Sequence, residues 1–281
     1  MKSLILFLPF LITACSSKEG TIVDDNSAQT ILNVSYGNNQ RQKFDLYLPA
    51  NRNTRDTRLL ILVHGGGWVD GDKTDFNGYI TELQRRLPDI AIANINYRLA
   101  GNNQNLFPAQ ENDVKDAVDF LLSKSDEYKT SKKIALLGAS AGAHLSLLHA
   151  YKQVSPVPVK AVISFFGPTD LVSLYNSPGN ASIPLLLGAV TGGTPSTKAS
   201  LYEQSSPSTF VNAQTVPTLL LQGGNDPLVP FQQALLLKDK LAANNVVHQY
   251  VFYPAEGHGW QGTSLEDSFD KITTFLGEYF K

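Results

Sequence analysis

A serine lies between two glycines in the segment LLGASAGAHLSLL, where Gly138, Ser140 and Gly142 form a G-x-S-x-G frame. In this frame a sharp turn from a strand into a helix presents the serine hydroxyl as a nucleophile. A serine that merely caps the following helix is the structural alternative. Because a serine hydroxyl is a poor nucleophile until a base removes its proton, the chemistry also requires a base from elsewhere in the chain.

Five histidines could supply that base. His258, in YPAEGHGW, follows the last predicted strand in a glycine-flanked loop, and such loops of a parallel sheet gather at its carboxyl edge. We therefore assign His258 as the base. His144 lies one helical turn after Ser140, and we expect its ring to pack beneath the turn as a structural group. His149 and His248 are expected to be ordinary packing or edge residues.

An imidazole base needs a carboxylate to hold its tautomer and to stabilise the imidazolium. Asp226, in TLLLQGGNDPLVP, lies in the turn after a strand and completes the chain order Ser, Asp, His. The rival acid is Asp170 in FFGPTD, which we expect instead to cap the segment that follows it. Glu256, two residues before His258, is expected to face solvent.

Attack of a serine on an acyl carbon produces an oxyanion, which requires hydrogen-bond donors. The stretch LLILVHGGGW ends a predicted strand in His64 and three glycines, and such glycines let main-chain N–H groups approach a substrate. The main-chain N–H of Ala141, directly after the serine, would complete the set of donors. A phosphate-binding loop is the alternative, but no Lys-Ser/Thr follows in P-loop spacing. We expect His64 to brace the loop.

Short apolar runs alternate with helical segments, which predicts an α/β fold with a mostly parallel eight-stranded sheet and helices on both faces. No helix separates the first two strands, so they are expected to pair antiparallel. The strands are predicted at 30–36, 42–48, 59–63, 90–96, 133–137, 160–165, 217–222 and 248–253. The helices are predicted at 75–87, 109–123, 141–151, 231–243 and 264–280.

The predicted sheet is interrupted by a long connection at residues 167–216, which contains the apolar patch IPLLLGAV. A connection this long is usually functional, so it is the candidate for a small cap or lid over a pocket. With 281 residues, 42% of them hydrophobic, the chain can form one large core, and we expect a single domain over residues 29–281. The formal net charge of -2 argues against nucleic acid as a partner.

The N-terminus has the layout of a secretory signal over residues 1–14, a basic start followed by an apolar run and small residues. It ends in ITAC, which resembles the lipobox of bacterial lipoproteins, so Cys15 is the predicted lipidation site. Cys15 is the only cysteine, which excludes an internal disulfide. Residues 15–28 are polar and are expected to form a flexible tether. We expect a cell-envelope protein that meets the membrane only through a lipid anchor, at the bacterial outer membrane or cell surface. An ordinary secretory signal is the alternative.

From about Tyr36 to the C-terminus, the chain resembles the α/β-hydrolase fold, and within it the bacterial feruloyl-esterase-like and acetyl esterase group with an HGGG oxyanion loop. The matching motifs are DLYLP, HGGGWVDGDK, NYRLA, FPAQENDVKDAVDFL, GASAGAHLSLL, LLGAVTGGTP, SSPSTFV, PTLLLQGGNDPLVP and GHGW. The resemblance implies Ser140 as nucleophile, His258 as base and Asp226 as its acid. It also implies Gly66, Gly67 and Ala141 as the oxyanion donors, although which two of the three loop glycines donate stays open. It implies a small-molecule or carbohydrate ester substrate and neither a metal nor an organic cofactor.

These observations favour a lipid-anchored serine carboxylesterase that acts through an acyl-enzyme. Three alternatives stay open. The first is an arylformamidase, which export disfavours because tryptophan catabolism is cytoplasmic. The second is a peptidase, since some catalytic domains of this fold cleave peptides, and the third is a non-catalytic surface binding module on the same fold. The sequence leaves acyl and alcohol specificity and the oligomeric state open.

Overall fold

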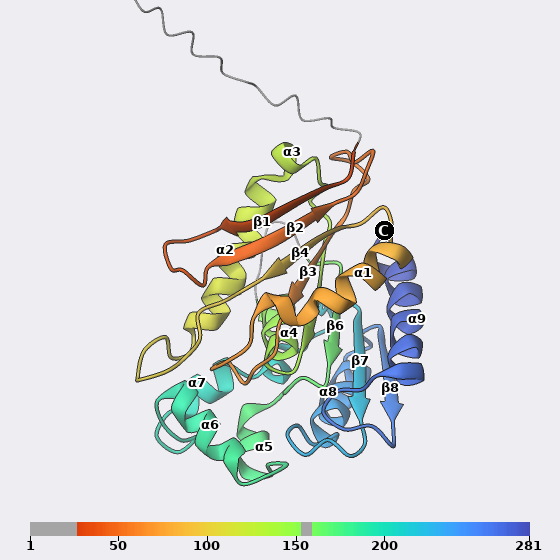
Figure 1. Cartoon of the computed structure of the whole chain (residues 1–281). Coiled ribbons are helices and arrows are strands. Elements are labelled where there is room, and N and C mark those ends of the chain that lie inside the picture. Colours follow the sequence, from red (N-terminus) through yellow and green to blue (C-terminus); the bar gives the residue numbers. More distant parts are fainter. Residues whose placement is uncertain (1–26, 153–158) are drawn as a thin grey trace, which may run out of the picture.

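The apolar runs of the sequence form one eight-stranded sheet in the structure, a computed structural model that describes residues 27–152 and 159–281 (Figure 1). Each predicted strand is confirmed to within two residues. The strands are β1 Gln29–Ser35, β2 Lys43–Leu48, β3 Leu59–Val63, β4 Ala91–Ile95, β5 Ile134–Ala139, β6 Ala161–Phe165, β7 Thr218–Gly223 and β8 His248–Tyr253.

The spatial order of the strands is β1-β2-β4-β3-β5-β6-β7-β8. β1 and β2 pair antiparallel, which confirms the expectation for the start of the sheet, and β2 also pairs antiparallel with β4. All pairs from β4 to β8 are parallel. The carboxyl ends of these six strands therefore meet at one edge, where the loops after β3, β5, β7 and β8 can come together.

The central strands of the sheet are buried on both faces, which explains why they read as continuous apolar runs. Helices α1 Asn77–Arg86 and α9 Gly262–Tyr279 pack on one face. Helices α2 Ala109–Ser123, α4 Ala141–Lys152 and α8 Gln232–Ala243 pack on the other (Figure 1). Alternate residues of each strand enter the two cores; in β3, for example, Leu60 and Leu62 face α1 and α9. The predicted α/β fold class is confirmed.

These five helices match the five predicted ones within two residues at each end. The sequence analysis missed several shorter elements, because a helix of one or two turns offers too little periodicity to be recognised. They are α3 Ser125–Tyr128, α5 Leu171–Asn176, α6 Ser182–Thr191, α7 Ala199–Gln204 and the 3-10 helices Lys73–Phe76 and Pro207–Phe210. Four of these elements build the segment 167–216, and Figure 1 shows α5, α6 and α7 grouped beside the sheet.

The predicted signal peptide, Cys15 and most of the proposed tether lie outside the described residues. Within residues 27–152 and 159–281, no helix combines the length and the apolar character needed to cross a membrane.

Candidate active site

Ser140 lies at the turn between β5 and α4 in a left-handed backbone conformation, with φ of 53°. A non-glycine residue rarely adopts this conformation, and here the N–H of Ser140 donates to the carbonyl of Phe165 at 2.8 Å, which holds the turn. Gly142 makes the turn possible, because a Cβ atom there would lie 2.0 Å from the carbonyl oxygen of Val63. The helix start thus packs directly against the end of β3.

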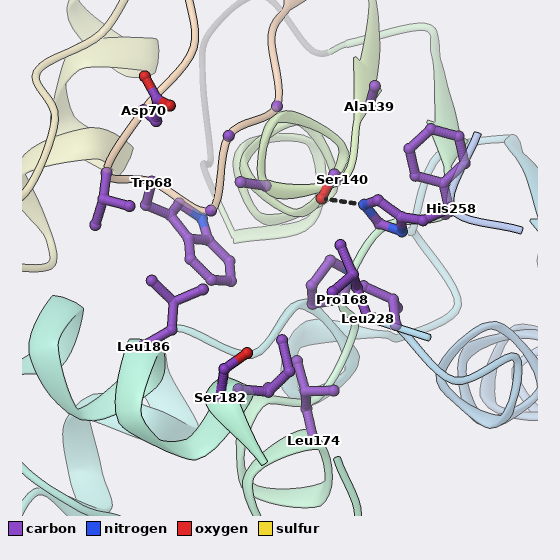
Figure 2. A pocket seen from close by; sticks show the side chains of 18 of the residues that line it. Trp68, Asp70, Ala139, Ser140, Pro168, Leu174, Ser182, Leu186, Leu228 and His258 are labelled. Carbon is purple, nitrogen blue, oxygen red and sulfur yellow. Dashed lines mark hydrogen bonds between the residues drawn. The ribbon is translucent and has the colours of Figure 1, made fainter. Parts of the chain in front are cut away.

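The three residues predicted for the proton relay form one hydrogen-bonded chain, of which Figure 2 shows the bond between Ser140 and His258. His258 Nε2 lies 2.9 Å from Ser140 Oγ, and His258 Nδ1 lies 2.7 Å from Asp226 Oδ2. The Asp226 side chain is fully buried, and its other oxygen accepts the main-chain N–H groups of Leu228 and Val229 at 2.8 and 2.9 Å. The carboxylate is therefore fixed on one side by the loop after β7 and on the other by the imidazole.

This arrangement determines which nitrogen of His258 carries the proton. A carboxylate can only accept, so Nδ1–H donates to Asp226 and leaves Nε2 free to accept from the Ser140 hydroxyl. The ring of Phe166 packs on the imidazole at 4.5 Å between centroids. The geometry is that of a serine hydroxyl prepared to lose its proton.

The predicted oxyanion loop follows β3 and borders the same pocket as Ser140. Gly66 has φ of 101°, and a Cβ atom there would lie 2.0 Å from the carbonyl oxygen of Asp70, so only glycine fits. Among the described residues, no main-chain hydrogen bond uses the N–H of Gly66 or Gly67. Ala141 is the first residue of α4, where an N–H has no partner within the helix. All three predicted donors thus border the space beside Ser140.

A polar network braces this loop from below, as expected for His64. Arg41 can only donate, and its Nη2 lies 3.4 Å from His64 Nε2 and 2.6 Å from the carbonyl of Gly71. His64 therefore carries its proton on Nδ1, which donates to the Gly65 carbonyl at 2.7 Å. The Tyr97 ring stacks on the imidazole at 4.3 Å. Burial lowers the pKa of His64 to about 4, and the neighbouring Arg41 charge acts in the same direction.

A pocket of about 520 Å³ opens in front of Ser140 and is lined mainly by apolar side chains (Figure 2). One wall is the oxyanion loop with Trp68. The opposite wall comes from segment 167–216, which contributes Leu174, Ile183 and Leu186. The predicted cap segment therefore borders the pocket, and Leu186 lies against the loop, since its Cδ2 would be 3.0 Å from a Cβ atom on Gly67.

The other candidate residues lie in structural positions. Asp170 caps α5 by accepting the Ser173 N–H at 2.8 Å. Both ring nitrogens of His144 are engaged by groups other than Ser140. His149 is buried, and its two ring nitrogens form no hydrogen bond with any residue the structure describes. His248 Nδ1 lies 2.8 Å from the Val246 carbonyl.

The expectation for Glu256 was wrong. Its side chain is only partly exposed, and it accepts a hydrogen bond from Ser264 Oγ at 2.6 Å, so it ties the His258 loop to α9. Sequence reasoning also missed Arg41, Trp68 and Leu186. Trp68 directly follows the glycines and could have been flagged for that reason; Arg41 gives no local signal, because its partners are distant in sequence.

In the two described stretches of chain, no group of three or more His, Cys, Asp or Glu side chains is placed to hold a metal ion.

Among known proteins, the chain is similar to esterases of Mycobacterium tuberculosis. It is 26% identical to Esterase LipC of Mycobacterium tuberculosis over 87% of this chain and 64% of the relative. It is 31% identical to the probable carboxylic ester hydrolase LipM of the same organism over 74% of this chain and 51% of the relative. The chain therefore spans between half and two-thirds of the lengths of these two relatives.

Solved structures share the fold. A truncated carbohydrate esterase from gut microbiota superposes with a TM-score of 0.76 at 22% identity, over 91% of this chain and 99% of that one. Esterase B from Lactobacillus rhamnosis gives a TM-score of 0.73 at 21% identity, over 90% of this chain and 86% of that one. Residues 44–241 match the BD-FAE family. With this match across most of the sheet and the fold of these esterases around it, the chain belongs to the BD-FAE family of α/β-hydrolase-fold proteins.

Proposed function

We propose that the protein is a serine carboxylesterase in which Ser140, His258 and Asp226 form the catalytic triad. The observation that supports this most directly is the hydrogen-bonded chain of 2.9 and 2.7 Å from the serine hydroxyl to the buried carboxylate. A non-catalytic binding module would not need that chain. The esterase names of the relatives in M. tuberculosis point to the same class of reaction.

In the proposed reaction, His258 Nε2 takes the hydroxyl proton as Ser140 Oγ bonds to the acyl carbon. The carbonyl oxygen becomes an oxyanion, which the N–H groups of Ala141 and of Gly66 or Gly67 stabilise. The bond to the alcohol oxygen then breaks, and the imidazolium protonates the leaving alkoxide. Water, deprotonated by the same imidazole, then attacks the acyl carbon. The bond to Ser140 Oγ breaks, the imidazolium returns its proton to Oγ, and the acid leaves.

For the substrate, we propose esters of small or carbohydrate-linked acyl groups. The apolar wall formed by Leu174, Ile183 and Leu186 suits an uncharged acyl group, and no lysine or arginine lines the described pocket. A carboxylate on the substrate would therefore lack a cationic partner near the serine. The segment 167–216 acts in this proposal as the cap that sets the space for the acyl group.

The test is release of p-nitrophenol from its acetate and butyrate esters, and of acetate from acetylated xylooligosaccharides, by the full chain and by Ser140→Ala. We expect Ser140→Ala to lose about three decades of kcat or more, as for removal of a triad member. Equal rates for the two proteins would refute the mechanism. An aryl formamide and a dipeptide anilide, assayed alongside, test the formamidase and peptidase alternatives.

We also propose that the protein is held in the cell envelope by a lipid on Cys15, with residues 1–14 removed as a signal. The support is the sequence of residues 1–15, with its signal-like layout and its ITAC ending, which precedes the described residues. Mass spectrometry of the chain expressed with its own N-terminus in a bacterial host measures this directly. An N-terminus without acyl groups, in a host that lipidates a control lipoprotein, would refute the anchor.

A further inference from the structure

His144 is a fully buried histidine with both ring nitrogens engaged. Trp68 Nε1 donates to His144 Nδ1 at 3.3 Å, and His144 Nε2 lies 2.7 Å from the carbonyl oxygen of Ser205. A carbonyl can only accept, so Nε2 carries the proton and Nδ1 accepts from the indole. Each ring nitrogen thus has one partner, and the tautomer is fixed by the two neighbours.

These contacts join three segments that the chain keeps far apart. His144 lies on α4, and its own N–H donates to the carbonyl of Ser140 at 3.0 Å, directly behind the serine. Trp68 follows Gly67 in the oxyanion loop, and Ser205 follows α7 in segment 167–216. One imidazole therefore connects the helix of the serine, the loop with the predicted oxyanion donors and the cap segment.

Trp68 is the contact through which His144 reaches the loop. Its backbone is in the left-handed region, with φ of 65°, a conformation that costs free energy for a bulky residue. Its side chain is 3% exposed, and its ring packs edge-on to His144 at 5.2 Å and to Phe107 at 5.9 Å. The buried indole and its hydrogen bond therefore hold a backbone conformation that the sequence by itself disfavours.

We propose that His144 is a positioning residue for the oxyanion loop: by accepting from Trp68, it fixes the loop glycines at the distance from Ser140 at which the oxyanion forms. This rests on the proposed esterase function. His144 takes no proton from the substrate and does not touch Ser140 Oγ, whose partner is His258. Its contribution is made through Trp68 and is expected in the rate of the chemical step.

The electrostatics of the site support this role. Burial lowers the pKa of His144 to about 4, so the ring is neutral at physiological pH and the Nδ1 lone pair is available to the indole. An imidazolium would place an N–H against the Trp68 N–H and break the contact.

The chain offers a matched control in His149. It lies on the same helix and is 2% exposed, but its ring nitrogens have no hydrogen-bond partner among the described residues. His149→Phe and His144→Phe therefore make the same exchange at equal burial, and only the second removes hydrogen bonds.

The experiment compares the full chain with His144→Phe, Trp68→Phe, the double variant and His149→Phe in the p-nitrophenyl butyrate assay. We expect His144→Phe to lower kcat about tenfold to a hundredfold with KM changed less than about threefold, as for misplaced transition-state donors. His149→Phe should match the unmodified protein. Because His144 and Trp68 act through one bond, the double variant should lose no more kcat than the worse single variant.

Rescue and spectroscopy separate positioning from general packing. His144→Asn places an amide oxygen near the Nδ1 position and should retain more kcat than His144→Phe. The chain has two tryptophans, so its ¹H–¹⁵N spectrum contains two indole signals. His144→Phe should move the Trp68 signal, whereas the signal of Trp260, which donates to Ser268 Oγ at 2.9 Å, should stay in place.

Two results would overturn the proposal. One is a kcat for His144→Phe equal to that of His149→Phe; the other is additive losses in the Trp68 and His144 variants. If His144→Phe does not fold, Trp68→Phe decides instead, and an unchanged kcat in that variant overturns the proposal. Failure of the esterase function itself looks different, because the unmodified protein and Ser140→Ala would then hydrolyse the ester equally.

Discussion

Replacing His149 by phenylalanine should make the protein less sensitive to acid. Burial lowers the pKa of His149 from 6.5 to about 4, with Lys115 acting in the same direction and Asp119 opposing it. Between these two values the unfolded chain binds a proton that the folded protein does not. The free energy of unfolding must therefore fall as the pH drops from about 6.5 to about 4, and the His149 contribution levels off below that.

The size of the effect follows from the two pKa values. One pKa unit is worth about 1.4 kcal/mol, so protonation of unfolded His149 costs the folded state about 2 kcal/mol at pH 5 and about 3 kcal/mol at pH 4. This loss is present in the unmodified protein and absent from His149→Phe. The buried His64 and His144, whose pKa values are also lowered to about 4, remain in both proteins and cancel in the comparison.

The assay is urea unfolding at pH 7, 6, 5 and 4, followed by tryptophan fluorescence and circular dichroism, for both proteins. His149→Phe removes no hydrogen bond to a described residue, so the free energies of unfolding of the two proteins should differ little at pH 7. The difference between them should grow by about 2 kcal/mol from pH 7 to pH 5. Parallel curves over this range would show that His149 protonates normally in the folded protein and would refute the reasoning.

Three further predictions concern the site. Asp226→Asn should lower kcat about a thousandfold to ten-thousandfold with an unchanged circular dichroism spectrum, because the imidazole loses its acceptor; a loss under tenfold would contradict the triad. Gly142→Ala should destabilise the fold by about 3 kcal/mol or more, measured by urea unfolding, since its Cβ would lie 2.0 Å from a β3 carbonyl; normal stability would show that the turn can shift. Leu186→Ala should raise the ratio of kcat/KM for octanoate esters to that for butyrate esters about tenfold. Leu185 is 76% exposed, and Leu185→Ala should leave this ratio unchanged. The same ratio in both variants would exclude Leu186 from the acyl site.

The sheet and the position of its catalytic candidates could be predicted from the sequence, because the signals are local. Apolar runs buried on both faces identify the strands, and residues that follow those strands must gather at one edge of a parallel sheet. Ser140, Asp226 and His258 each follow a strand in this way, and the structure brings them within hydrogen-bond distance. The short helices were missed, most of them in segment 167–216, since one or two turns give no readable period.

What only the tertiary structure decided is how the oxyanion loop is held. Arg41 reaches His64 across 23 positions, Trp68 reaches His144 across 76, and Leu186 lies against Gly67 from a separate segment. None of these side chains has a neighbour in sequence that indicates its partner. Pairing of this kind depends on how strands and helices pack in three dimensions, and packing is fixed by the whole chain rather than by any short stretch of it.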